Sequence, residues 1–242
     1  MVARAVGRRR WSRSVGRGAV AGALAGLLLL VSACGNASNK YVVNKSAGVY
    51  VKVPESWSHV RIQDPSLLGI DSRQLSPDEY LALASREWMT TLDASGNRKP
   101  TTALAPDADV PNGFLQVRQL LPEEAKTIST DSLRNLLVSV DDAQAAEVEA
   151  VAKDPVNARL KPAFLLLTDD TVKKADGVHG VHLVYQLSTA AGLATIDQTS
   201  LLDRDQTVLY QLVLTCTALC YFQYTSAVAR VTSSFTIKST TN

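Results

Sequence analysis

The sequence has few of the residues that build metal centres and redox sites. Its 242 residues include three cysteines and three histidines, and aromatic residues make up 6%. It contains no Cys-x-x-Cys or His-Glu-x-x-His spacing and no aspartate-rich calcium loop, the patterns with which short motifs hold metal ions. His179 and His182 are three residues apart on a predicted strand, which places them on opposite faces. We therefore expect no bound metal and no cofactor.

The signatures of the common enzyme classes are absent as well. There is no Gly-x-Ser-x-Gly elbow, no Ser-x-x-Lys followed by Ser-Asp-Asn, and no glycine-rich phosphate loop. The paired acids Asp141-Asp142 and Asp169-Asp170 stand where a helix start or a loop would carry them. These absences favour a protein that is not an enzyme, and no residue is predicted to be catalytic.

Acidic residues are missing from the first 33 positions, which hold six arginines. Removing these six from the 25 basic residues leaves 19 against 23 acidic ones, a net charge of −4 for the rest of the chain. Lys and Arg form no stripe of phosphate-binding size after residue 33, so we expect no nucleic-acid partner.

The N-terminus has the three parts of a secretory signal. Residues 1–17 are arginine-rich, residues 18–31 are apolar, and small residues precede a cysteine. The apolar run is shorter than the roughly 20 residues that a membrane span needs. The string Leu30-Val31-Ser32-Ala33-Cys34 resembles a bacterial lipobox.

In lipobox proteins the cysteine is acylated and becomes the new N-terminus. The resemblance implies that residues 1–33 are a signal peptide, with Leu30, Val31, Ser32 and Ala33 read by the signal peptidase and Cys34 carrying diacylglycerol and a further fatty acid such as palmitate. Several acyl chains give stable membrane anchoring. The polar residues 34–46 would then be a lipidated tether, and the domain would lie on the extracytoplasmic face of the cell membrane. The alternatives are a plain secretory leader, an uncleaved anchor, and export by the twin-arginine route.

About 200 residues remain for one domain, predicted to span residues 47–242. Ser76, Pro77 and Glu79 form a capping signature for a helix that we expect to reach Leu92. Further helices are predicted at 131–138, 141–153 and 221–232. Strands are predicted at 48–53, 114–121, 163–168, 178–188, 194–203, 207–215 and 235–238. The order predicts an α+β fold, a central antiparallel sheet flanked by helices.

Cys216 and Cys220 are the two cysteines that follow Cys34. In the oxidising compartment outside the membrane they are expected to form a disulfide. On one regular helix their Cβ atoms would lie too far apart to bond. We therefore predict a non-helical turn between the strand that ends at Thr215 and the helix that begins near Tyr221. A redox-active pair and two unpaired thiols remain alternatives.

Both ends of the mature chain resemble PsbP-like domains. The opening string is Val49-Tyr50-Val51-Lys52-Val53-Pro54-Glu55-Ser56-Trp57, and the closing segment runs from the strand near Cys216 through residues 221–237. The resemblance, shared with many actinobacterial lipoproteins, implies an α/β/α sandwich without a catalytic centre. PsbP-like relatives include photosystem subunits and a nuclear-transport factor that binds the GTPase Ran, and none of their binding residues falls on the matched segments.

Together these features predict a membrane-anchored cell-envelope lipoprotein that binds a protein partner or assists envelope assembly. The alternative is a carrier of a lipid or another apolar small molecule between membrane and cell wall, which would need an apolar cavity. An enzyme is the third hypothesis. The sequence identifies no ligand-binding residue and no partner.

Overall fold

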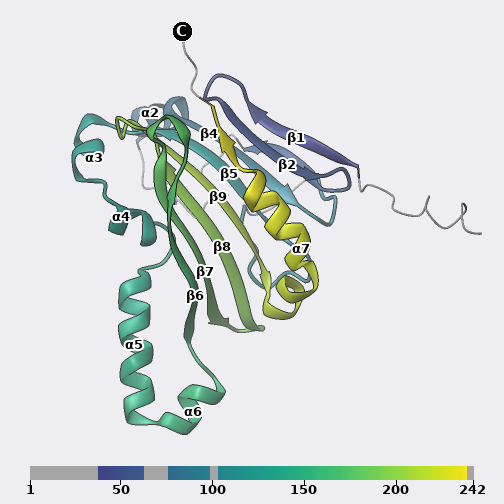
Figure 1. The fold of residues 1–242 in the computed structure, drawn as a ribbon, viewed down its shortest axis with the longest axis vertical. Helices are drawn as coiled ribbons and strands as arrows, with labels where there is room; N and C mark the ends of the chain where they lie inside the picture. The colour runs from purple at the N-terminus through teal and green to yellow at the C-terminus, as the bar shows by residue number, and fades with distance from the viewer. Residues whose placement is uncertain (1–37, 63–75, 99–102, 239–242) are drawn as a thin grey trace, which may run out of the picture. The chain divides into compact units, whose positions relative to one another are not determined.

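The computed structural model describes residues 38–62, 76–98 and 103–238. The predicted signal peptide and Cys34 lie outside the described residues. The described part contains two antiparallel sheets and a set of helices (Figure 1). The α+β prediction is confirmed, whereas the division into two sheets was not predicted.

The large sheet has seven strands. Their spatial order is β3 (Ser58–Ile62), β4 (Glu87–Asp93), β5 (Asn112–Gln119), β9 (Val208–Thr217), β8 (Gly192–Leu202), β7 (His179–Thr189) and β6 (Phe164–Lys173). The small sheet consists of β1 (Asn39–Asn44), β2 (Val49–Pro54) and β10 (Thr236–Ile237). The helices are α2 (Pro77–Arg86), α3 (Pro122–Thr127), α4 (Thr130–Arg134), α5 (Val140–Lys153), α6 (Pro155–Leu160) and α7 (Ala218–Ser234).

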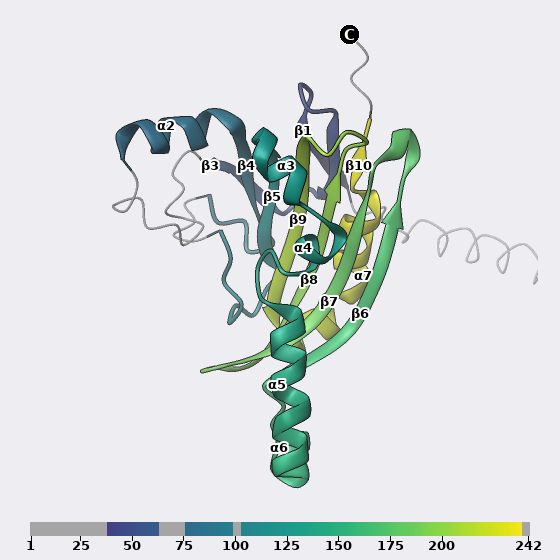
Figure 2. The same ribbon diagram turned by 90° about the vertical axis from the view of Figure 1, so that its left-hand side faces the viewer.

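The central strands β8 and β9 of the large sheet are buried on both faces. On one face the large sheet packs against α7 and the small sheet, in a cluster that joins Val51 of β2, Leu212 of β9 and Val231 of α7. On the other face Leu133 of α4 and Val140 at the start of α5 pack on β7, β8 and β9. Beyond Val140, α5 and α6 form an arm that projects past the end of the sheet (Figure 2).

Valines on alternate positions of β2 hold the small sheet in place. Val49, Val51 and Val53 have an exposed fraction of 0%, whereas Tyr50 is half-buried and Lys52 is exposed. This period of two is the pattern of a strand with one buried face. The predicted alternation of this strand is confirmed.

Two sequence predictions are wrong in this half of the chain. The helix at Ser76 begins with the predicted capping box, but it ends at Arg86 instead of Leu92. Residues 87–93 form β4, in which four consecutive residues from Met89 to Leu92 are buried. Pairing with β3 and β5 on both sides therefore outweighs the helical spacing.

The second wrong prediction concerns the tether at residues 34–46. Asn39–Asn44 are strand β1, which pairs residue by residue with β2 from Asn39 opposite Pro54 to Asn44 opposite Val49. Val42 is buried beneath this pair. This strand was not predicted because most of its residues and neighbours are polar, although a strand needs apolar residues on one face only.

Most of the remaining predictions agree with the structure. The strands predicted after residue 113 correspond to β5 to β10, and the helix predicted at 141–153 corresponds to α5. The helix predicted at 131–138 ends at Arg134. The strand predicted at 163–168 continues to Lys173, so Asp169 and Asp170 lie within β6 and not in a loop or at a helix start, because this segment pairs with β7 along its length. The hairpin between β8 and β9 is closed by Asp203, whose Oδ1 accepts the N–H groups of Thr207 at 2.7 Å and Val208 at 2.9 Å. The short helices α3 and α6 were not predicted.

The alternation of β2 makes a stability prediction. Val51→Thr places a hydroxyl without a partner in the core, so it should lower the free energy of unfolding by about 2 kcal/mol. Lys52→Ala, one residue on and exposed, should change it by less than about 0.5 kcal/mol. Urea unfolding of both variants measures the difference, and equal effects would contradict the assignment of the two faces.

Candidate functional site

The predicted disulfide between Cys216 and Cys220 is present, at the junction of β9 and α7. Cys216 is the next-to-last residue of the strand, Cys220 lies in the first turn of the helix, and their Cα atoms are 5.9 Å apart. The predicted non-helical turn is wrong. The helix begins at Ala218, and Thr217 caps it by accepting the N–H of Cys220 at 3.3 Å.

Burial favours a structural role for this disulfide. Cys216 has an exposed fraction of 0% and Cys220 of 2%, whereas redox-active cysteines are accessible to their reaction partners. A short loop gains little from chain entropy. The bond therefore serves to fix the start of α7 on the sheet.

Beside the disulfide, three polar side chains form a hydrogen-bonded group that the sequence did not reveal. Asp197 of β8 has an exposed fraction of 4%. Its Oδ1 lies 3.0 Å from Nε2 of His182 on β7, and its Oδ2 accepts the hydroxyl of Tyr221 on α7 at 2.9 Å. The one sign of this group in the sequence is Asp197 itself, a single aspartate in an otherwise uncharged predicted strand.

Two side chains of this group, His182 and Tyr221, have a raised pKa. The hydrogen bond to Asp197 raises the pKa of His182, against the opposing effect of burial. Burial and the neighbouring Asp197 raise the pKa of Tyr221. Both carboxylate oxygens of Asp197 have a hydrogen-bond partner, so the group links β7, β8 and α7. Nδ1 of His179 donates to the backbone oxygen of Gly177 at 3.0 Å.

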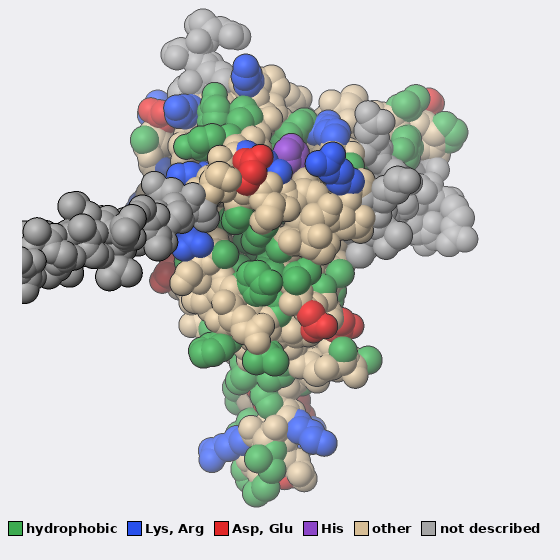
Figure 3. Space-filling view, turned by 90° about the vertical axis from the view of Figure 1, so that its right-hand side faces the viewer, with side chains coloured by type: hydrophobic (Ala, Val, Ile, Leu, Met, Phe, Trp, Pro, Cys, Tyr) green, Lys and Arg blue, Asp and Glu red, His purple; other side chains and the backbone are tan. Residues whose placement is uncertain are grey.

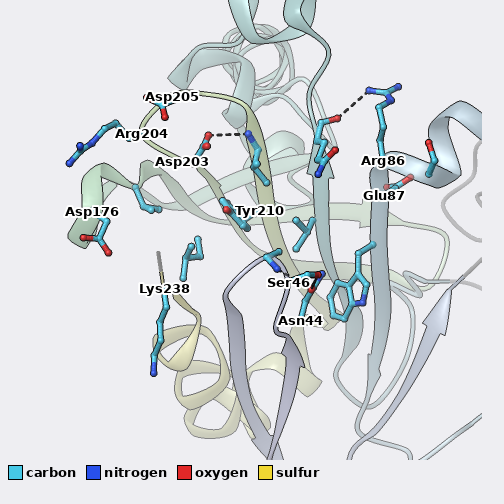
Figure 4. A pocket seen from close by; sticks show the side chains of 18 of the residues that line it. Asn44, Ser46, Arg86, Glu87, Asp176, Asp203, Arg204, Asp205, Tyr210 and Lys238 are labelled. Carbon is cyan, nitrogen blue, oxygen red and sulfur yellow. Dashed lines mark hydrogen bonds between the residues drawn. The ribbon is translucent and has the colours of Figure 1, made fainter. Parts of the chain in front are cut away.

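A pocket of about 700 Å³ lies where the small sheet meets the top of the large sheet (Figure 4). Seven segments meet at it. They are the β1–β2 turn, the end of β10, β3, the α2–β4 junction, β5, the β8–β9 hairpin with β9, and the turn before β7. No short stretch of sequence contains the site, which is why sequence reasoning missed it.

Aromatic and apolar side chains line the inner part of the pocket. Trp88, Val117 and Tyr210 share the face of the large sheet that the small sheet covers. The guanidinium of Arg61 lies 5.1 Å from the ring centre of Trp88, in cation–π geometry. Burial, and then the charge of Asp203, raise the pKa of Tyr210 to about 12. Among the described residues, no hydrogen bond is formed by its hydroxyl.

Charged side chains of both signs surround the opening. Some serve the fold: Arg86 donates to the backbone oxygen of Gln119 at 3.1 Å and pairs with Glu124 at 3.3 Å, and Asp203 closes its hairpin. Asp176, Arg204 and Asp205 form no ion pair with any described residue and lie on one side of the pocket in Figure 4. These three charges remain available to a ligand.

The described residues show neither a metal site nor a membrane span. No group of three or more His, Cys, Asp and Glu side chains in this part of the chain could hold a metal ion. None of the described helices has the length and apolar character to cross a bilayer. The described residues that line the pocket therefore hold no metal ligand set.

Comparison with known proteins gives similar folds at low sequence identity. Solved structures that this chain resembles include the cyanobacterial PsbP protein CyanoP of Synechocystis sp. PCC 6803, with 14% identity over 85% of this chain and 96% of that one and a TM-score of 0.39. LpqN of Mycobacterium tuberculosis, described as involved in cell envelope biogenesis, has 13% identity, coverage of 84% and 91%, and a TM-score of 0.39. Protein PA94 of Pseudomonas aeruginosa, of unknown function and described as a putative regulator, has 13% identity, coverage of 84% and 99%, and a TM-score of 0.34.

One of these neighbours is a PsbP protein, the family that residues 49–57 and the closing segment to residue 237 resemble. TM-scores below 0.5 transfer no function, and the α+β assignment rests on the sheets and helices themselves. No family model and no curated protein matches the sequence.

The His182–Asp197 contact predicts a pH-dependent stability. A raised pKa in the folded state means that the stabilisation is complete below the ordinary value of 6.5 and is lost as the pH rises through the raised value. The free energy of unfolding should therefore fall above pH 6.5, and His182→Gln should abolish this fall. Urea unfolding between about pH 5 and pH 9 measures it.

His59 provides the matched control. Burial, followed by the charges of Lys40 and Arg98, lowers the pKa of His59, so its contribution has the opposite sign and acts below pH 6.5. His59→Gln should leave the fall above pH 6.5 in place. If His59→Gln removes that fall and His182→Gln does not, the assignment is wrong.

Proposed function

We propose that this protein is a cell-envelope lipoprotein, anchored through acylated Cys34, whose domain binds a protein partner in the pocket between the two sheets. The lipobox-like string at residues 30–34 supports the anchor. The Cys216–Cys220 disulfide supports an oxidising compartment, since such bonds are rare in the cytosol. We assign no catalytic activity to the domain.

The observation that carries the binding function is the composition of the pocket. Trp88, Tyr210 and Arg61 are of the three residue types that most often dominate binding energy in protein interfaces. Around them lie charges of both signs, of which Asp176, Arg204 and Asp205 lack ion-pair partners among the described residues. An apolar centre within a charged rim is the arrangement of a protein-binding surface.

The same composition counts against the alternative function as a carrier. A lipid carrier needs an enclosed cavity with an apolar lining. Eight of the residues that line this pocket are charged: Arg61, Arg86, Glu87, Asp176, Asp203, Arg204, Asp205 and Lys238. Burying acyl chains against such side chains would remove their hydration without replacing it. A polypeptide can pair with them instead.

The anchor is tested on the full chain expressed in a bacterial host. We expect the N-terminal peptide of the purified protein to begin at Cys34 and to carry the mass of its acyl groups. Cys34→Ala should lose the acyl mass and keep residues 1–33, since acylation precedes cleavage in lipobox proteins. Ser32→Ala, which keeps a small residue, should be processed normally. A parent protein without acyl groups would contradict the anchor.

The partner site is tested by photo-crosslinking in intact cells. A photoreactive residue in place of Ser46, at the pocket, should give a crosslinked protein, whereas one in place of exposed Ser226 on α7 should not. Arg204→Glu should weaken the product about tenfold or more if a charge-assisted contact is lost. Mass spectrometry of the product identifies the partner.

Two results would contradict the partner site. The first is equal crosslinking from Ser46 and Ser226, which would indicate collisions instead of binding. The second is a native mass spectrum in which the purified domain retains a lipid that is absent under denaturing conditions. That result would favour the carrier.

A further inference from the structure

The small sheet has a second face that points away from the core. It consists of Tyr41 and Val43 of β1, Tyr50 and Lys52 of β2, and Thr236 of β10, which lie opposite one another in the pairing register. Tyr41 has an exposed fraction of 62%. We call these five residues the outer face of the small sheet.

Basic side chains surround this face. The ammonium group of Lys238 lies 5.0 Å from the ring centre of Tyr50, and Lys45 is exposed in the β1–β2 turn. Residues 34–54 contain three lysines and no acidic residue, and Glu55 is the first acidic residue of the chain. Figure 3, which views the molecule from the side of β1 and β2, shows basic, acidic and hydrophobic side chains together in its upper part.

Only one of the three lysines is held by the protein. Lys40, on the inner side of β1, donates to the backbone oxygen of Glu55 at 2.9 Å. Lys45 and Lys52 form no ion pair with any residue that the structure describes, and neither does Lys238. The outer face thus offers tyrosines and uncompensated positive charge.

The distance to the proposed anchor is short. Four residues, 35–38, separate Cys34 from Asn39, the first residue of β1. Five Cα–Cα steps span at most about 18 Å, about the radius of gyration of a domain of this size. A domain held on so short a chain cannot rotate freely above the bilayer, and the strand that follows the anchor must stay close to the lipid headgroups.

We propose that the outer face of the small sheet lies on the anionic surface of the membrane that holds the lipid anchor. This inference rests on the proposed acylation of Cys34. Tyrosines concentrate at the membrane–water interface, where the ring meets apolar groups and the hydroxyl remains hydrated. Lysines near a bilayer are attracted by anionic headgroups. The pocket, which shares Lys238 and the β1–β2 turn with this region, then opens next to the membrane.

The arm formed by α5 and α6 serves as the internal control. Leu160, at the end of α6, has an exposed fraction of 74%, and Figures 1 and 2 show the arm at the end of the molecule away from the small sheet. An exposed apolar residue there has no anchor beside it. If exposure alone decided which residues contact the membrane, Leu160 would do so as readily as Tyr41. We expect the contact at Tyr41 and not at Leu160.

The experiment uses the lipidated full-length protein in vesicles of phosphatidylcholine and phosphatidylglycerol, with bromine on the acyl chains of the phosphatidylcholine. Tyr41→Trp and Leu160→Trp place a reporter on the outer face and on the arm. We expect bromine to quench the added fluorescence of Tyr41→Trp about threefold or more strongly than that of Leu160→Trp, since interfacial side chains lie at the headgroup–acyl boundary.

The charge contribution is tested in the same vesicles. Lys52→Glu in the Tyr41→Trp background should weaken the quenching, and so should salt at about 1 M, where the Debye length falls to about 3 Å. Vesicles without phosphatidylglycerol should have the same effect. If none of the three changes weakens the quenching, the inference that anionic headgroups attract this face is wrong.

Flotation of the vesicles separates the failure of this inference from that of the proposed function. If the protein floats with the vesicles but Tyr41→Trp is quenched no more than Leu160→Trp, the anchor stands and the outer face does not lie on the membrane. If the protein does not float, the anchor itself is wrong and the orientation falls with it.

Discussion

Three fully buried valines on β2 determine how this end of the molecule is built. Val49, Val51 and Val53 pack against the large sheet and α7. Because side chains alternate along a strand, their burial obliges Tyr50 and Lys52 to point outward. The same packing brings the β1–β2 turn and the end of β10 beside β4 and β9, which forms the pocket. One apolar stripe therefore creates both the pocket and an exposed face.

The central strands β8 and β9 impose a second constraint, since they are buried on both faces. Polar side chains on them need partners inside the protein. Asp197 is satisfied by His182 and Tyr221 on one face, and on the other Gln198 donates to the backbone oxygen of Leu133 at 2.9 Å. These contacts tie α7 and α4 to defined positions on β8. The disulfide acts at the same place, because it fixes the turn of α7 that carries Tyr221.

The strands of the C-terminal half could be predicted in large part because their apolar residues alternate or run together between turn residues. The errors arose where two elements follow one another without a break. Arg86 ends α2 and Glu87 begins β4 with no loop between them. The apolar residues keep the three- and four-residue spacing of a helix beyond Arg86, although the chain there is already a strand. β1 was not predicted because it buries only one valine and one asparagine, which is enough for an edge strand that pairs with β2. Whether such a segment becomes a strand depends on the neighbouring strands with which it pairs, and these cannot be identified from a single sequence.

The pocket could not be predicted, since its residues come from segments that meet only after both sheets have formed. The outer face presents a different case. Packing explains the valines of β2 and the buried side of β1, but it places no demand on the residues that point outward. Tyrosine suits an exposed strand position, but the sign of a charge there changes stability little. The presence of three lysines without an acidic residue in residues 34–54 therefore points to a constraint outside the fold, and an anionic surface next to the proposed anchor is a constraint of this kind.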